Sequence, residues 1–298
     1  MFQRIIVPLD GSASAEAALP AAALLARRLG SSIVLLHVVE ARPPKEVHGE
    51  RHLAAAAEAE AYLGPIAERL RAEGLDVKAH VHLDGKTDVA GEVAAHEAEF
   101  GNDLAVMVAH GEHGHADILS GSIPLKVAAA GGAAVLMVPA SDAAAVSLPR
   151  RILLPLDGRE EHEVSIPAAE TLARIFGASV ALVAAVPKRS ADATGAGRII
   201  ARLAPALSGA SLEYAADGAA TYLARVAERL KAAGVEAGWS VARGRPAKVV
   251  SAAAEAGDLV VLSTHRRMGL DASMDGCVAF SVALSWHGAM LIVPVPRA

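Results

Sequence analysis

Residues 4–11 read Arg-Ile-Ile-Val-Pro-Leu-Asp-Gly, and residues 151–158 read Arg-Ile-Leu-Leu-Pro-Leu-Asp-Gly. The second stretch begins 147 residues after the first, counted from Arg4 to Arg151. Each stretch is a short run of branched apolar residues that ends in Pro-Leu-Asp-Gly. A repeat of this kind in a chain of 298 residues indicates that one type of domain occurs twice.

The similarity continues along both halves of the chain. Further matching pairs are residues 24–27 with 171–174, 66–70 with 226–230, and 103–106 with 258–261. Because the spacing is not constant, the second copy carries an insertion, which we place in the Gly-, Ala- and Ser-rich residues 191–220. Residues 140–149 read as a linker. We therefore expect two domains, at residues 1–140 and 150–298.

In the first copy, short apolar runs alternate with longer segments rich in Ala, Leu, Arg and Glu. Their unbroken apolar character is typical of strands that are covered on both faces. The segments 14–29 and 62–73 have helical composition, with Gly30 and Gly74 where C-terminal caps would lie. The alternation predicts an α/β fold, with a doubly wound, five-stranded parallel sheet of Rossmann-like type in each copy. The predicted strands are residues 5–9, 33–39, 77–82, 104–109 and 134–138.

The composition excludes several classes of protein. Hydrophobic residues make up 53% and charged residues 20%, as in a globular protein. Aromatic residues are only 3% and the net charge is −5, so we expect no nucleic-acid partner. We also expect no membrane span, because no apolar run approaches the ~20 residues that a span needs. A single cysteine and no signal-type apolar stretch lead us to expect a cytoplasmic protein.

Two strand ends are candidates for a ligand site. In open α/β sheets, ligands bind beyond the carboxyl ends of the strands, where the strand order reverses. Residues 8–12, Pro-Leu-Asp-Gly-Ser, lead from the first predicted strand into a helix. After the fourth strand, His110-Gly111 opens a loop that closes at Gly121-Ser122 before another helix. Glycines let backbone N–H groups approach a phosphate, and a helix N-terminus adds partial positive charge.

These residues resemble the pattern of the universal stress proteins. Nucleotide-binding members of that family carry Gly-x2-Gly-x9-Gly-Ser/Thr after the fourth strand and an Asp at the end of the first. The first copy keeps Gly111, Gly121 and Ser122 of this pattern, while Val108 replaces the first glycine.

The second copy departs further from the family pattern. It reads Ser263-Thr-His-Arg266, nine residues, and then Gly276-Cys277, so both early glycines and the hydroxyl are lost. The resemblance covers essentially the whole chain. It implies two tandem universal stress protein domains that form a pseudo-dimer within one chain, and it leaves a further homodimer open.

The resemblance also implies a ligand and its contacts. The expected ligand is ATP, ADP or AMP, with Mg²⁺ as a companion ion that is left open. Asp10 and the backbone of Val38 are implied to contact the adenine or the ribose, and the loop residues the phosphates. The full set of implied binding residues is Asp10, Val38, Gly111, Gly121 and Ser122 in the first copy, with Asp157 and Gly276 in the second.

Structural roles compete with these assignments. Asp10 and Ser12 could simply cap the helix that follows, and Ser122 could be an ordinary N-cap. Glu112 stands where many binding members have a basic residue, and its carboxylate would repel a phosphate unless a cation intervenes. In the second copy, Arg266 could fill the phosphate space or reach a phosphate itself.

Other candidate chemistry is weaker. His110, His113 and His115 could bind a metal ion, although a glycine-rich loop with solvated histidines explains them as well. His80 and His82 lie on one face of a predicted strand, where we expect structural or surface histidines. Cys277 could be redox-sensitive or a small packed residue. With no defensible catalytic base, we expect no enzyme beyond slow ATP hydrolysis.

The sequence therefore supports three hypotheses. The first is a stress-response regulatory protein that binds an adenine nucleotide mainly in its first domain and is read by protein partners as yet unknown. The second is a nucleotide-free scaffold or interaction module with a degenerate pocket. The third, a nucleotide hydrolase, has the least support. The resemblance also implies that the last strands of the two copies pair with each other, and residues 134–138 and 290–293 are apolar enough to do so and cover exposed edges.

Overall fold

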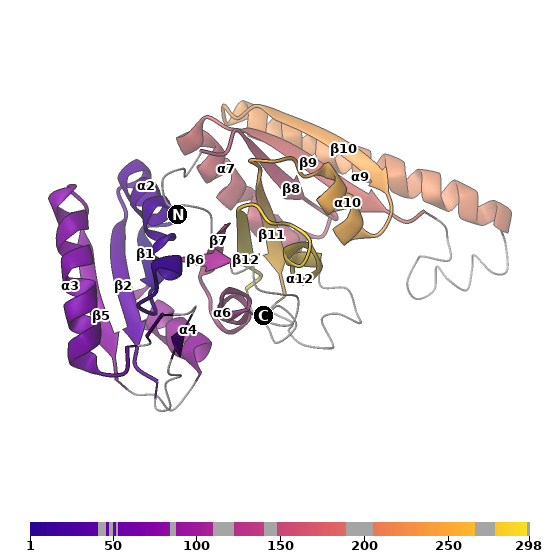
Figure 1. Ribbon diagram of the computed structural model, residues 1–298. Helices are drawn as coiled ribbons and strands as arrows, with labels where there is room; N and C mark the ends of the chain where they lie inside the picture. The colour runs from indigo at the N-terminus through magenta and orange to yellow at the C-terminus, as the bar shows by residue number, and fades with distance from the viewer. Residues whose placement is uncertain are drawn as a thin grey trace. The chain divides into compact units, whose positions relative to one another are not determined.

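The fold is seen in a computed structural model, which describes residues 1–40, 46–47, 50–51, 53–83, 88–109, 122–139, 148–188, 205–265 and 278–296. The chain forms two compact units (Figure 1). Unit 1 comprises residues 1–147, 264–275 and 289–298. Unit 2 comprises residues 148–263 and 276–288.

Unit 1 is built on a mostly parallel sheet. Its strands lie in the order β12-β7-β6-β1-β2-β5, in which all neighbours except β12 and β7 run parallel. Their bounds are β1 Arg4–Pro8, β2 Ser32–Val38, β5 Val77–His82, β6 Leu104–Ala109, β7 Ala134–Pro139 and β12 Met290–Pro294. A separate two-stranded ribbon pairs β3, Glu46–Val47, with β4, Glu50–Arg51. The five strands predicted for the first copy and their parallel arrangement are confirmed.

Helices cover both faces of this sheet. The helices of unit 1 are α1 Ala13–Glu16, α2 Leu19–Leu29, α3 Ala56–Ala72, α4 Val89–Phe100 and α6 Ile123–Ala130. From β1 the chain moves outward through β2 to β5, then returns to the other side of β1 at β6. Right-handed crossovers in opposite directions place α2 and α3 on one face and α4 and α6, which contact each other, on the other. The α/β class and the doubly wound topology are therefore as predicted.

The first predicted helix is two helices. The segment 14–29 is divided into α1 and α2, with Pro20 in the first turn of α2. Proline lacks an amide hydrogen and its ring crowds the preceding turn, so it starts a helix more readily than it continues one. Gly30 caps α2 with a φ of 70°, as expected.

The last strand of the chain pairs within unit 1. Strand β12 runs antiparallel to β7, with Leu291 opposite Leu136 and Ile292 opposite Val135. All four residues are buried. The pairing predicted between the last strands of the two copies is confirmed, and it covers an apolar strand edge that would otherwise be open.

Unit 2 repeats the same topology with four parallel strands. The order β10-β9-β8-β11 reproduces the order β5-β2-β1-β6 of unit 1. Helix α9 has 28 residues where α3 has 17, so it overlaps the insertion expected at residues 191–220. The elements are β8 Arg151–Pro155, η1 Glu160–Val164, α7 Ser165–Phe176, β9 Ser179–Val186, α9 Pro205–Ala232, β10 Ala237–Arg243, α10 Pro246–Ala253, β11 Leu259–Thr264 and α12 Val278–Ala283.

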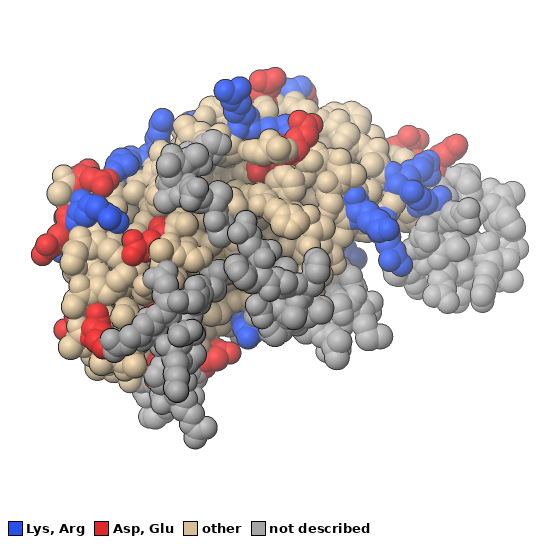
Figure 2. All heavy atoms as spheres, viewed as in Figure 1, with Lys and Arg blue, Asp and Glu red and all other residues tan. Residues whose placement is uncertain are grey.

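The surface charges of the visible face are mixed. Figure 2 shows acidic and basic side chains interspersed on the described part of this face, without a continuous basic patch. Such a patch is the electrostatic mark of a nucleic-acid site. Within the described ranges, no helix combines the length and the apolar character that a membrane span requires.

Candidate functional site

The strand order of unit 1 reverses between β1 and β6. Strand β1 lies between β2 and β6, and its residues Ile5, Ile6 and Val7 have no exposed surface. The carboxyl ends of these parallel strands meet at one edge of the sheet, where Asp10 follows β1 and Val38 ends β2. This is the place where open α/β sheets bind ligands. The structure therefore puts two of the predicted residues on neighbouring strands at the expected edge.

Asp10 organises the turn after β1. Its Oδ1 accepts hydrogen bonds from the Ser12 backbone N–H, at 2.9 Å, and from the Ser12 hydroxyl, at 2.6 Å. The Ser12 Oγ in turn accepts from the Ala15 N–H at 3.1 Å, which makes buried Ser12 the N-cap of α1. The capping role left open by the sequence is thus present, and a ligand contact by the half-buried Asp10 carboxylate stays a prediction.

Gly11 makes this turn possible. Its φ of 94° is in the left-handed region, and an added Cβ would lie 2.8 Å from Cγ of Leu53. Its counterpart Gly158 has a φ of 82°, but there the nearest atom, Cδ1 of Tyr222, is 4.0 Å from an added Cβ. In both units the glycine of the repeated Asp-Gly dipeptide therefore adopts a left-handed backbone conformation in the turn.

The backbone of Val38 is placed by the alternation of β2. The Leu36 carbonyl accepts from Leu9 N–H at 2.8 Å, whereas Val39 N–H donates to the His82 carbonyl at 2.9 Å. Alternate residues of a strand face the same neighbour, so the peptide groups of Val38 face the β1 side, beyond the point where β1 ends. They lie where a planar base could exchange hydrogen bonds with the backbone.

A buried histidine, which sequence reasoning missed, links β2 to the backbone that follows β1. His37 is 1% exposed, and its Nδ1–H donates to the Leu9 carbonyl at 2.7 Å. Its Nε2 lies 3.4 Å from the Leu53 carbonyl. A histidine inside an otherwise apolar strand was the only signal of this role, because its partners are distant in sequence.

Ser122 occupies the N-cap position of α6. Its carbonyl accepts from the Lys126 N–H at 3.1 Å, and Pro124 stands in the first turn. Its side chain makes no capping hydrogen bond, in contrast to Ser12 of α1. The ordinary side-chain cap considered for Ser122 is therefore not formed.

The remaining members of the predicted cradle lie outside the described residues. They are Gly111, Glu112, Gly121, Arg266, Gly276 and Cys277, together with the histidines His110, His113 and His115. Their proposed roles rest on the sequence alone.

The corresponding turn of unit 2 has different hydrogen bonds. Asp157 Oδ1 accepts from the Arg159 N–H at 3.1 Å and from Nδ1–H of His162 at 2.8 Å. Its Oδ2 lies 3.6 Å from Nε of Arg159. Both carboxylate oxygens of Asp157 thus already have cationic or N–H neighbours within the unit. A ligand here would compete with these contacts.

A second hydrogen-bonded pair lies close to this turn. The Tyr222 hydroxyl of α9 donates to Oε1 of Glu163 at 2.9 Å. Burial is the largest cause that raises the pKa of Tyr222, and the hydrogen bond to Glu163 adds to it. This phenol therefore stays protonated and acts as a donor at any physiological pH.

Known proteins resemble this chain in sequence pattern and in fold. The model of the Universal stress protein family matches residues 1–139 and again residues 149–294. No curated protein matches the chain.

Solved structures match the chain at low sequence identity. A universal stress protein from Archaeoglobus fulgidus has a TM-score of 0.71 and 15% identity, over 99% of this chain and 97% of its own. A protein of unknown function from Pseudomonas aeruginosa has a TM-score of 0.68 and 18% identity, over 99% and 93%. At these identities the likeness shows the fold. The two family matches, which together span nearly the whole sequence, carry the conclusion that this chain belongs to the universal stress protein family, with two of its domains in tandem.

Proposed function

We propose that this protein is a stress-response regulator that binds an adenine nucleotide, mainly in its first domain. The observation that supports this most is the arrangement at the reversal point of unit 1. There an acidic turn, the strand backbone of Val38 beyond the end of β1, and a serine N-cap belong to the elements that border one sheet edge. Asp10 and the Val38 backbone offer acceptors and donors for the adenosine part.

The phosphates are assigned to the start of α6. Ser122 presents a hydroxyl that caps nothing in its own helix, and the N-terminus of α6 adds partial positive charge. Gly111 and Gly121 would let the preceding loop bring its N–H groups close to phosphate oxygens. Mg²⁺ would offset the charge of Glu112 in this arrangement.

Unit 2 is proposed as the weaker nucleotide site. The Asp157 carboxylate accepts from the Arg159 N–H of its own turn and also contacts the side chains of His162 and Arg159, whereas Asp10 accepts from the N–H and the hydroxyl of Ser12. In addition, the sequence of the second copy lacks the early glycines and the Ser122 hydroxyl. We therefore assign Asp157 and Gly276 a secondary role.

Calorimetric titration of the full chain with Mg·ATP, ADP and AMP tests the proposal. The variants Asp10→Asn and Ser122→Ala each remove one hydrogen-bonding partner, and each should weaken binding by about tenfold or more. Asp157→Asn is the matched control, because it makes the same change at the same place in unit 2. It should alter the affinity by less than about twofold if the first domain is the main site.

A second control separates contact from capping. Ser12→Ala removes the N-cap of α1 but keeps the Asp10 carboxylate. If Ser12→Ala weakens binding as much as Asp10→Asn does, Asp10 acts through the turn and not through the ligand. If the unaltered protein shows no heat with any of the three nucleotides, the proposal fails, and a scaffold or interaction module becomes the better account.

A further inference from the structure

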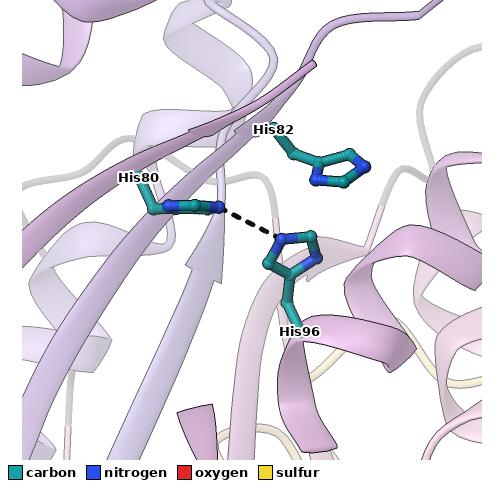
Figure 3. A group of neighbouring side chains, drawn as sticks. All are labelled: His80, His82 and His96. Carbon is teal, nitrogen blue, oxygen red and sulfur yellow. Dashed lines mark hydrogen bonds between the residues drawn. The ribbon is translucent and has the colours of Figure 1, made fainter. Parts of the chain in front are cut away.

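Three histidines of unit 1 converge between β5 and α4, and one of them, His82, lies opposite Val38 on the neighbouring strand. His80 and His82 come from the edge strand β5, and His96 comes from α4, which covers that face of the sheet (Figure 3). One ligand nitrogen from each ring can be chosen so that all lie within 4.8 Å of one another. From the sequence we expected His80 and His82 to be structural or surface residues. The third member of the cluster, His96, belongs to another element and could not be recognised from spacing.

The shortest of these approaches has the spacing of two metal ligands. Nε2 of His80 lies 3.1 Å from Nε2 of His96. Two nitrogens bound to one tetrahedral Zn²⁺ at about 2.0–2.1 Å are separated by roughly 3.3 Å. At this distance an N–H of one ring can donate to the nitrogen of the other, and a metal ion would take the place of that proton.

Glu92 of α4 contacts two of the three rings, those of His96 and His82. Its backbone carbonyl accepts from Nδ1–H of His96 at 2.8 Å, which leaves Nε2 of His96 as the nitrogen with a lone pair. Its carboxylate Oε2 lies 3.0 Å from Nε2 of His82 and so supports that side of the ring. Hydrogen bonds of this kind, in which the N–H of the far ring nitrogen donates to a carbonyl or a carboxylate, are the usual supports of metal-bound histidine.

The surroundings of the cluster suit a bound ion. His96 is 3% and Glu92 is 8% exposed, while the rings of His80 and His96 also pack against Phe100. A cluster that is partly buried keeps its side chains in fixed positions, and exposed Glu99, 3.7 Å from His96, adds negative charge nearby.

The fold itself does not require these histidines. In unit 2 the places of His80 and His82 are taken by Ser240 and Ala242. The correspondence follows from the strands, because Ile33 N–H bonds to the Asp76 carbonyl in unit 1 as Val180 N–H bonds to the Glu236 carbonyl in unit 2. The same topology is therefore built without any ligand at these positions.

We propose that His80, His82 and His96 bind a divalent late transition-metal ion, with Zn²⁺ as the primary candidate, and that this ion ties the edge strand β5 to α4. Three imidazoles and no thiolate suit Zn²⁺, Ni²⁺ or Cu²⁺ and disfavour Mg²⁺ and Ca²⁺, which prefer oxygen ligands. A His₃ set also leaves one position for water or an external ligand.

Calorimetric titration of the EDTA-treated full chain with Zn²⁺ tests this site. The parent protein for the test carries His110→Gln, His113→Gln and His115→Gln, so that the histidine-rich loop supplies no imidazole ligand. We expect one Zn²⁺ per chain and an increase in melting temperature on binding, with no such effect of Mg²⁺. In this parent, His82→Gln and Glu92→Gln should each weaken Zn²⁺ binding at least about tenfold.

The controls separate the loss of a metal ligand from the loss of an unrelated histidine and from unfolding. His287→Gln removes an exposed histidine of unit 2 and should leave the Zn²⁺ titration unchanged. His96→Gln alters a buried ring, so its result counts only if circular dichroism shows a folded protein, whereas half-buried His82 and the isosteric Glu92 change avoid that problem. The proposal is overturned if the parent binds no Zn²⁺, or if the titration is the same in His82→Gln and Glu92→Gln as in the parent.

Discussion

The turn after β1 shows how a few residues serve both fold and site. Asp10 accepts two hydrogen bonds from Ser12, Ser12 caps α1, and Gly11 supplies the left-handed conformation between them. Each of these roles can be read locally from Asp-Gly-Ser. The same carboxylate is therefore held in place by its own turn, which would lower the entropic cost of the nucleotide binding that we propose for it.

Replacement of Gly11 by alanine should destabilise unit 1. The change forces a non-glycine residue to a φ of 94° and brings its Cβ against Leu53. The control is Gly158→Ala, which carries the left-handed strain without a clash. We expect Gly11→Ala to cost about 1–2 kcal/mol more than Gly158→Ala, measured by thermal unfolding. Equal losses for the two variants would show that Leu53 moves aside freely.

The pKa of His80 predicts a pH dependence of the metal-free protein. Burial is the main cause that lowers this pKa from 6.5, the charges of His96 and His82 lower it further, and Glu99 opposes the shift. Glu92 is the other charged group of the cluster, through its contact with His82. Near this pKa the folded state therefore binds fewer protons than the unfolded state. The free energy of unfolding keeps its full value above about pH 6.5 and decreases as the pH falls toward the lowered pKa of His80.

Thermal melts in EDTA at pH 7.5 and pH 5.5 check this dependence. His80→Gln should reduce the loss of melting temperature on acidification, and His287→Gln should not. A loss as large in His80→Gln as in the unaltered protein would contradict the assignment.

At the level of elements, an aspartate at the start of the fourth strand of each unit accepts hydrogen bonds from the start of the first strand. In unit 1 the Asp103 carboxylate accepts from the backbone N–H groups of Gln3 and Arg4. In unit 2 the equivalent Asp258 instead receives two hydrogen bonds from the Arg151 guanidinium, at 3.0 and 2.7 Å. The hydrogen bond with Asp258 is the main cause that raises the pKa of Arg151.

Loss of this charge pair should be costly because Asp258 is 4% exposed. We expect Asp258→Asn to lower the stability of unit 2 by about 2 kcal/mol. Glu228→Gln breaks the exposed pair with Lys231 on α9 and should change it by no more than about 0.5 kcal/mol. Chemical denaturation of both variants gives the comparison, and similar effects would mean that the buried pair adds little.

Much of the architecture follows from local sequence, and the histidine cluster shows where such reasoning stops. Strands such as β2 were predicted within one residue because their apolar runs are unbroken. The division between α1 and α2 was missed, although Pro20 marked it. His80 and His96 meet only because α4 folds back over β5, a contact that no spacing in the sequence expresses.

The candidate nucleotide site was partly predictable for a similar reason. Asp10, Val38 and Ser122 each stand at a strand end or helix start, and such boundaries can be recognised from composition. The capping bonds of Asp10 and the absence of one at Ser122 depend on side-chain geometry, which the residue types alone leave open. His37 lay unnoticed because its partners, Leu9 and Leu53, belong to other elements.

On the scale of the whole chain, the duplication and the placement of the final strand are the main features. The last strand of the second family repeat, β12, completes the edge of the sheet in unit 1 by pairing with β7. Met290, Leu291 and Ile292 are each 1% exposed there. The chain terminus therefore protects an apolar edge that could otherwise pair with another molecule.

Deletion of residues 289–298 should expose the β7 edge. We expect a lower melting temperature and concentration-dependent self-association, which sedimentation velocity over a range of concentrations would detect. Deletion of residues 296–298 alone leaves β12 intact and is the control. A truncated chain that sediments and melts like this control would contradict the protective role of β12.

Binding of an adenine nucleotide by the first domain can be measured by native mass spectrometry of the intact chain. With added ATP, ADP or AMP, we expect a mass increase of one nucleotide per chain, which is reduced in Asp10→Asn and Ser122→Ala and retained in Asp157→Asn. A chain whose mass does not shift with an excess of any of the three nucleotides would contradict this expectation.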